Sequence, residues 1–302
     1  MDSLINDPET LETYSKDASI FKVIPKYVAF PKNSNDIKEL IKYAKEHGES
    51  ITMRAAGTDM TGGPLSESIV VDVTKHMNKI GEVIVEPGLR HAEAGYVLAE
   101  AGAFYRDFEK KTLEKGLILP CYPASKNLCA LGGMIANNCG GEKSLRWGKM
   151  ENFIIESKWI FADGNEYVIR PGVIDNEYAE KIKELIITNY ELIQNAKPKV
   201  SKNSAGYALW NVIDKEKGTF DLSQLITGSQ GTLAVVTSAK LGLVKLKKNR
   251  AMLVVFLSDI EILPEIVRRV LAIGPESFES YDDQTFKLAV RFIPQILRHF
   301  GL

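Results

Sequence analysis

Four short segments of the sequence combine glycine with small or hydroxyl-bearing residues, as phosphate-binding loops do. The first, RAAGTDMTGG (residues 54–63), directly follows an apolar run that we expect to be a strand. Consecutive small residues let backbone N–H groups point into one concavity, and such a nest binds a diphosphate. Thr58 and Thr61 would add hydroxyl donors, and Arg54 would supply charge or hold the loop in place. Because glycine-rich loops also form plain hairpin turns, this segment alone fits a structural turn equally well.

The second segment, LGGMIANNCGG (residues 131–141), contains two glycine pairs. Its two glycine pairs lack Cβ atoms, so another part of the protein or a ligand must come close. In one interpretation, GGMIANN forms a first helical turn whose free N–H groups face an anion, and CGG ends it at a left-handed residue. The alternative is a close contact between this helix and a sheet. The other two segments are a stiff bend, PCYPAS (residues 120–125), and a Gly-Ser turn entering a strand, LITGSQGTLAVVT (residues 225–237).

Composition excludes several classes of protein. The 302 residues are 45% hydrophobic and 25% charged with a formal net charge of -1, which is ordinary for a globular protein and offers no basic field for nucleic acid. The first residues are polar and acidic, and no apolar run is long enough to span a bilayer, so we predict a cytoplasmic protein. Cys121, Cys129 and Cys139 lack CxxC spacing and are expected to be buried free thiols.

The elements that must position these segments alternate between helical and strand patterns. We predict strands at 23–31, 50–57, 68–74 and 81–88, helices at 33–48, 90–102 and 176–196, a hairpin at 153–169 turning at Asp163 and Gly164, and a strand pair at 233–246. This mixture predicts an α+β fold rather than a doubly wound parallel sheet. After about Lys248 a new strand and helix begin, followed by a helical segment at 285–302.

The four segments, together with SKNSAGYALW (residues 201–210), resemble FAD-linked oxidases and dehydrogenases of the vanillyl-alcohol-oxidase-like family in their order and spacing. Within that family the chain is most similar to the branch of glycolate oxidase subunits and D-lactate or D-2-hydroxyglutarate dehydrogenases, over roughly residues 23–246. The resemblance implies a PCMH-type fold of two α+β subdomains (about 20–75 and 76–248) with FAD between them. Residues 249–302 would then begin an incomplete cap (substrate) domain.

The resemblance also implies which residues bind FAD. The first loop would wrap the diphosphate, the turn at 123–125 would approach the flavin, the second segment would line the pyrophosphate, ribityl chain and ring edge, and the fourth would lie near the adenosine half. The residues implied are Arg54, Ala55, Ala56, Gly57, Thr58, Asp59, Thr61, Gly62, Pro123, Ala124, Ser125, Gly132, Gly133, Ala136, Asn137, Asn138, Gly140, Gly141, Gly231, Val235 and Val236.

Several residues in these segments differ from those usual in the family, which affects the expected binding of FAD. Ala55 and Ala56 replace glycines, which requires negative φ angles. Gln230 replaces a usual Glu, and Asp59 brings a carboxylate to the diphosphate loop, which is unfavourable unless it turns toward solvent or Arg54. Thr58 stands where some members carry a histidine that binds FAD covalently, so we expect a non-covalent cofactor.

Dehydrogenation of a 2-hydroxy acid needs a base for the hydroxyl proton, which in the resembled branch is a histidine on the cap domain. The four histidines, His47, His76, His91 and His299, lie outside the four segments. We therefore name no catalytic base and predict no metal site.

We expect the FAD-binding portion of an enzyme that transfers hydride from a small 2-hydroxy acid to flavin N5, completed by a cap domain or a partner subunit, with an unknown electron acceptor. Two alternatives stay open: a stand-alone flavin-binding or electron-transfer subunit, and a reductase of the cell-wall UDP-sugar type.

Overall fold

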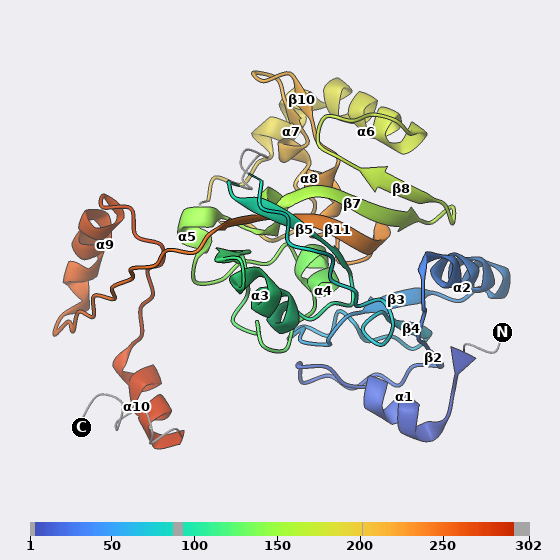
Figure 1. The fold of residues 1–302 in the computed structure, drawn as a ribbon, viewed down its shortest axis with the longest axis horizontal. Coiled ribbons are helices and arrows are strands. Elements are labelled where there is room, and N and C mark those ends of the chain that lie inside the picture. The colour runs from blue at the N-terminus through green and yellow to red at the C-terminus, as the bar shows by residue number, and fades with distance from the viewer. Residues whose placement is uncertain (1–3, 87–92, 201, 293–302) are drawn as a thin grey trace.

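Two larger β-sheets and one two-stranded sheet lie in the body of the molecule, and two helices near the C-terminus lie apart from it (Figure 1). The computed structural model describes residues 4–86, 93–200 and 202–292. The mixture of parallel and antiparallel pairing with helices confirms the α+β class.

The first sheet has the strand order β1-β2-β4-β3, with β2 and β3 both parallel to β4. Its strands are β1 (Leu4–Ile5), β2 (Tyr27–Ala29), β3 (Ile51–Arg54) and β4 (Ile69–Asp72), and α1 (Pro8–Tyr14) follows β1. The predicted helix is α2 (Ser34–His47), which connects β2 to β3. Its start is capped by Asn33, whose side chain accepts two backbone N–H groups, and it ends at Gly48 with φ 65°. A separate small core lies between α2 and this sheet.

The second sheet is antiparallel throughout, with the order β5-β11-β7-β8 and with β6 also paired to β11. Its strands are β5 (Gly95–Glu100), β6 (Leu117–Ile118), β7 (Ile154–Phe161), β8 (Glu166–Ile169) and β11 (Ala234–Lys245). The predicted hairpin is confirmed: Gly164 has φ 86° and the Asp163 carboxylate accepts the N–H of Asn165.

The larger hydrophobic core is built on this second sheet. Trp159, Tyr105, Phe108 and Phe153 are its largest fully buried side chains. Tyr105 and Phe108 come from α3 (Tyr105–Leu113), and the same core includes residues of α4 (Leu131–Ala136), which contacts β5 and β11. The remaining elements are α5 (Ser144–Trp147), η1 (Met150–Asn152), α6 (Glu177–Thr188), α7 (Tyr190–Asn195), η2 (Leu209–Asn211), β9 (Ile213–Asp214), β10 (Thr219–Phe220), α8 (Ser223–Ile226), η3 (Ile260–Ile262), α9 (Leu263–Leu271) and α10 (Asp283–Phe292).

Two predictions between residues 81 and 102 are wrong. Instead of a helix, residues 95–100 form β5, in which Val97 and Ala99 are buried and Leu98 is exposed. Pairing along β11 outweighs the helical preference of alanine and leucine. Of the strand predicted at 81–88, the described residues make only an isolated bridge between Ile84 and Tyr96. Residues 87–92 lie outside the described part of the chain.

Three further predictions need correction. The helix predicted at 176–196 divides into α6 and α7 at Asn189, whose side-chain amide donates to the carbonyl of Leu185. The strand pair predicted at 233–246 is the single strand β11, bent by two irregularities rather than by a turn. The strand predicted after Arg250 is absent from the described residues, where 251–257 have no regular secondary structure.

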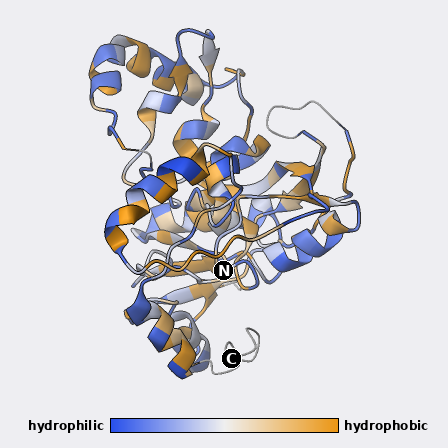
Figure 2. Ribbon diagram, turned by 90° about the vertical axis from the view of Figure 1, so that its left-hand side faces the viewer, coloured by the Kyte–Doolittle hydropathy of each residue, from blue (hydrophilic) through white to orange (hydrophobic). Residues whose placement is uncertain are grey.

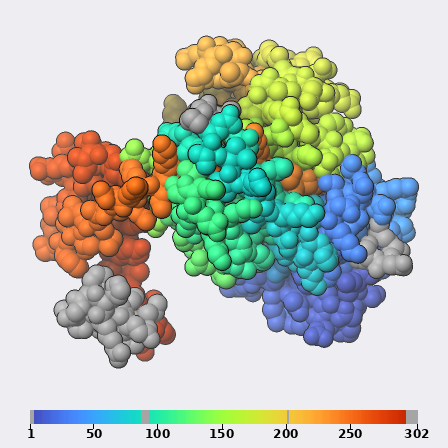
Figure 3. All heavy atoms as spheres, in the orientation of Figure 1, coloured from blue at the N-terminus to red at the C-terminus, as the bar shows by residue number. Residues whose placement is uncertain are grey.

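Residues beyond about 248 form an arm that projects from the body (Figure 3). Residues 251–257 of this arm, AMLVVFL, are all hydrophobic, whereas α9 and α10 carry both hydrophobic and hydrophilic residues (Figure 2). Neither helix contains a buried residue, and Met252 and Phe256 are largely exposed. The described part of the arm therefore has little core of its own.

Candidate cofactor-binding site

The first loop and the second predicted segment meet at α4. A Cβ atom placed on Gly133, in the first turn of α4, would lie 3.4 Å from Cβ of Ala55 in the loop. A Cβ atom on Gly231, in the fourth segment, would lie 4.0 Å from Cβ of Met53 in β3. Segments separated by about eighty and more residues in the sequence thus converge on one region.

The third and fourth segments also contact the second. A Cβ atom on Gly141 would collide with the backbone carbonyl of Tyr122, beside the bend at 123–125. The N–H of Gly228 donates to the carbonyl of Ile135, and the N–H of Gln230 donates to the carbonyl of Ala136. The four segments that the sequence singled out are therefore neighbours around α4.

Protein contacts account for three of the four glycines of the second segment. A Cβ atom on Gly132 would lie 2.8 Å from the carbonyl oxygen of Ala101, which precedes α3 and follows β5. The close contact between this helix and a sheet that we considered as an alternative thus explains Gly132, whereas Gly133 faces the first loop.

The second glycine pair is confined by loop residues. Gly141 admits the backbone of Tyr122, and a Cβ atom on Gly140 would collide with the side chain of Ser144.

The left-handed residue after α4 is Asn138, with φ 46°, and not one of the glycines at 140 and 141 as expected. The Asn138 side chain supports this conformation, because its amide donates to the Glu151 carboxylate and its oxygen accepts the N–H of Glu151. Asparagine tolerates this backbone region better than most residues. Neither glycine therefore needs a positive φ angle to end the helix.

Ala55 and Ala56 of the first loop have the negative φ angles that they require. Among the described residues, the non-glycine residues with positive φ are Asn138 and Gln230, so Ala55 and Ala56 are unstrained. The left-handed positions of the loop are Gly57, with φ 65°, and Gly62, with φ 86°.

Arg54, at the start of the loop, bridges to the N-terminal part of the chain. Its Nη2 donates to the carbonyl of Lys16 at 2.8 Å, and its guanidinium lies 5.2 Å from the ring centre of Tyr14. Its Nη1 is buried without a partner among the described residues. Arg54 thus holds the loop in place and keeps one donor free.

The Asp59 carboxylate turns back into its own loop rather than toward Arg54. Its Oδ1 accepts the N–H of Thr61 at 2.5 Å and the Thr61 hydroxyl at 2.6 Å. Although burial alone would raise it, the pKa of Asp59 is lowered, because Thr61 and the backbone N–H groups of Gly63 and Gly62 stabilise the carboxylate. The Asp59 carboxylate therefore occupies N–H and hydroxyl donors of the loop that would otherwise be available to a diphosphate.

Unpartnered buried groups concentrate around the same region. In the described part of the chain, four buried side-chain atoms lack a hydrogen-bond partner: Asp17 Oδ2, Arg54 Nη1, Thr227 Oγ1 and Ser229 Oγ. Buried polar atoms are normally hydrogen-bonded, so each of these calls for an explanation. Arg54 belongs to the first segment and Thr227 and Ser229 to the fourth. The residues present therefore fit a polar ligand such as FAD.

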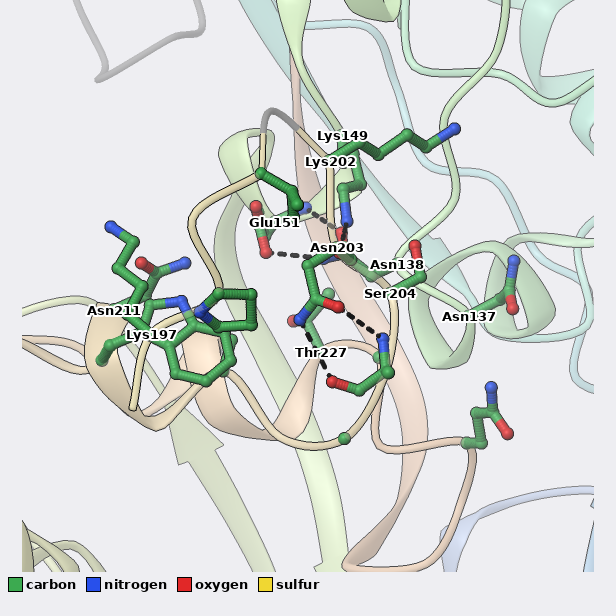
Figure 4. A pocket seen from close by; sticks show the side chains of 18 residues that line it. Asn137, Asn138, Lys149, Glu151, Lys197, Lys202, Asn203, Ser204, Asn211 and Thr227 are labelled. Carbon is green, nitrogen blue, oxygen red and sulfur yellow. Dashed lines mark hydrogen bonds between the residues drawn. The ribbon is translucent and has the colours of Figure 1, made fainter. Parts of the chain in front are cut away.

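A polar cavity of about 320 Å³ adjoins the C-terminal end of α4 (Figure 4). Asn137, Asn138 and Thr227 line it together with several residues between 197 and 200 and between 202 and 211. Lys149 crosses one side, where its Nζ donates to the carbonyl of Asn203 at 2.7 Å. The lining residues from 202 to 210 belong to the segment SKNSAGYALW, which contributes to the family resemblance but from which no residue was expected to bind the cofactor. The cluster of Lys, Asn and Ser at 202–204 was the available signal.

Neither of the two histidines in the described residues enters this site. His47 lies on α2, where its Nδ1 is 2.8 Å from the carbonyl oxygen of Tyr43, and His76 is exposed in a turn. His91 and His299 lie outside the described residues. The described ranges contain no group of three or more His, Cys, Asp or Glu side chains that could hold a metal ion.

The three cysteines are free and buried, as expected. Burial raises the pKa of Cys129 to about 11 and that of Cys121 and Cys139 further. The thiolate is the reactive form, and a raised pKa disfavours it. We therefore interpret these buried thiols as packing residues, of which Cys121 and Cys139 lie within the third and second segments.

Helices within the described part of the chain are too short or too polar to cross a lipid bilayer.

Comparison with known families and proteins gives consistent matches. The family model described as FAD binding domain matches residues 25–170. D-2-hydroxyglutarate dehydrogenase of Pantoea ananatis is 30% identical over 283 residues, which cover 88% of this chain and 25% of that protein. D-lactate dehydrogenase of Archaeoglobus fulgidus is 28% identical, over 83% of this chain and 47% of that protein. Glycolate oxidase subunit GlcD of Bacillus subtilis is 27% identical, over 90% of this chain and 49% of that protein.

The chain thus spans between a quarter and a half of the length of these three relatives. Among solved structures, an alkyldihydroxyacetonephosphate synthase superposes with a TM-score of 0.55 at 17% identity, covering 82% of this chain and 39% of that one. This similarity supports the fold alone.

Proposed function

Since residues 25–170 belong to the FAD binding domain family of the FAD-linked oxidases and dehydrogenases, we propose that this chain is the FAD-binding portion of a dehydrogenase for a small 2-hydroxy acid. The single observation that carries the proposal is the convergence of the four glycine-bearing segments around α4. The relatives named for D-2-hydroxyglutarate, D-lactate and glycolate supply the substrate class.

In this proposal the chain divides into an FAD-binding domain at 1–248, with subdomains at about 20–75 and 76–248, and the start of a cap domain at 249–302. The two separate hydrophobic cores support the division into subdomains. FAD would lie between the loop at 54–62 and α4, with the bend at 123–125 toward the flavin and residues 231–236 toward the adenosine half.

The chain's own residues would hold the cofactor mainly through its backbone. Loop N–H groups and the free Nη1 of Arg54 would bind the diphosphate, and the hydroxyls of Thr227 and Ser229 would find partners on the sugar or ribityl chain. FAD accepts a hydride at N5 when bound, and a base from outside the described site would take the hydroxyl proton.

The proposal is tested by the visible spectrum of the purified protein after incubation with FAD and removal of free cofactor. We expect flavin bands at one FAD per chain. Because Thr58 provides no covalent link, the colour should leave with the supernatant after denaturation. A protein that takes up no flavin would contradict FAD binding, and colour retained in the precipitate would contradict a non-covalent site.

The substrate class is tested separately, on the full-length protein or the complex, by anaerobic addition of D-lactate, glycolate or D-2-hydroxyglutarate. Bleaching of the flavin by one of these acids supports a dehydrogenase. Flavin that is reduced by none of them but exchanges electrons with a partner protein would instead support an electron-transfer subunit.

A further inference from the structure

Residues 14–21, YSKDASIF, lie against the first loop, although the matched family residues begin only at 25. We call residues 14–21 the N-terminal clamp. None of its residues was assigned to the site by the sequence, and its contacts are made at three separate points along the loop.

The first point is the start of the loop. The carbonyl of Lys16 accepts Nη2 of Arg54, and the ring of Tyr14 lies beside the same guanidinium. Tyr14 is itself fixed, because its hydroxyl donates to the Asp72 carboxylate at the end of β4, at 2.6 Å. The orientation of Arg54, and hence of its free Nη1, therefore depends on the clamp.

The other two points are the left-handed glycines of the loop. The N–H of Ala18 donates to the carbonyl of Gly57 at 3.2 Å. The Phe21 ring covers Gly62, since a Cβ atom placed there would lie 3.0 Å from Cδ2 of Phe21. Glycines at positive φ are the positions where a loop changes direction most easily. Contacts at both of them restrict the directions of the N–H groups between them.

The clamp also has a defined shape of its own. The Asp17 carboxylate accepts the N–H and the hydroxyl of Ser19, and the Ser19 hydroxyl in turn accepts the N–H of Phe21. These bonds form a compact turn, so the clamp can transmit a fixed geometry to the loop. The second carboxylate oxygen of Asp17 is among the four buried atoms without a partner in the described chain.

We propose that the N-terminal clamp sets the shape of the diphosphate loop and that Tyr14 and Phe21 are positioning residues for cofactor binding. This inference rests on the proposed function, in which the loop at 54–62 receives the FAD diphosphate. The cofactor site of this chain thus begins upstream of the matched family residues.

The test compares Phe21→Ala with Ile24→Ala, a matched control outside the clamp. Phe21 is 53% exposed, so its removal should leave the fold intact, and Ile24 is 57% exposed. We expect Phe21→Ala to weaken FAD binding roughly tenfold, because the loop must then be ordered during binding. Binding of riboflavin, which carries no phosphate, should be unchanged. Ile24→Ala should match the unsubstituted protein for both ligands, and Phe21→Leu should restore part of the FAD affinity.

Hydrogen exchange of residues 57–63 in the protein without FAD gives a second readout. Faster exchange in Phe21→Ala than in Ile24→Ala is the expected result. Equal exchange in both variants, or equal losses of FAD and riboflavin affinity in Phe21→Ala, would contradict the proposed role of the clamp in shaping the loop. If the unsubstituted protein binds no FAD, the proposed function fails, and the exchange comparison still decides whether the clamp orders the loop.

Discussion

At the residue scale, adjacent glycines in α4 serve different purposes. Gly132 allows α4 to approach the backbone of Ala101, whereas Gly133 leaves ordinary contact distance to Ala55 in the first loop. The sequence predicted that bulk must be absent here, but a glycine pair carries no information about which partner approaches each member. Only the pairing of β5 with β11, which places Ala101, resolves that question.

This difference predicts that alanine substitutions at the two glycines change the free energy of unfolding by different amounts. Gly132→Ala would place Cβ 2.8 Å from a backbone oxygen that cannot move freely, so we expect a loss of about 1–3 kcal/mol in the free energy of unfolding. Gly133→Ala, with its nearest neighbour at 3.4 Å, should unfold like the unsubstituted protein. Urea denaturation followed by circular dichroism measures both. Equal stability of the two variants would show that α4 can shift away from Ala101.

Asp59 gives a second prediction at this scale. Asp59→Asn keeps an oxygen that accepts the N–H of Thr61 but removes the negative charge from the diphosphate loop. We expect FAD to bind roughly fivefold more tightly, since relief of about 1 kcal/mol of repulsion between partly solvated charges gives such a change. Calorimetric titration with FAD checks this, and Asp259→Asn, in an exposed turn of the same geometry, is the control. Weaker binding would mean that the Asp59 carboxylate supports the loop instead of opposing the cofactor.

At the element scale, the sequence predicted best where the determining contacts are local. The helix at 34–47 has its cap at Asn33, its apolar stripe and its terminal Gly48 within one segment. β5 was missed because its small residues fit a helix, and only its neighbour β11, far along the chain, selects a strand.

The candidate site shows the same contrast between features with a local sequence signal and features without one. Its four segments were recognisable from their glycines, and the structure brings them together around α4, whereas the binding of FAD by their residues stays a prediction. The N-terminal clamp was not recognisable, because Lys16 and Ala18 act through backbone groups that every residue possesses.

The link between the arm and the body predicts a pH dependence. Glu276 lies 3.1 Å from Lys247 and 3.8 Å from Lys143, and Arg146 donates to the carbonyl of Gly274. Although burial would raise it, the pKa of Glu276 is lowered by these cations. A lowered folded-state pKa means that the stabilisation is present above the unfolded value, near 4.5, and is lost as the pH falls through the folded value.

We therefore expect hydrogen exchange around residues 274–276 to become faster as the pH falls below the unfolded value near 4.5, relative to the intrinsic exchange rate. Glu276→Gln should show the faster exchange already at neutral pH and little further change on acidification. A pH response that persists in Glu276→Gln would assign the effect to another carboxylate.

At the scale of the whole molecule, the site joins two separately packed parts. The first loop extends from the sheet that carries the smaller core, and α4 packs on the sheet that carries the larger one. Within the described residues no buried hydrophobic side chain follows Val244, so both cores are complete before the arm begins.

This arrangement predicts that the body is independent of the arm. A variant ending at Lys248 should lose less than about 1 kcal/mol of unfolding free energy, because partly exposed ion pairs such as those of Glu276 contribute little. Its affinity for FAD should equal that of the whole chain, and loss of the exposed Met252 and Phe256 should reduce self-association. Thermal unfolding, FAD titration and light scattering measure these properties. A marked loss of FAD affinity with unchanged folding would show that the arm covers the cofactor, which would assign residues 249–302 to the site itself.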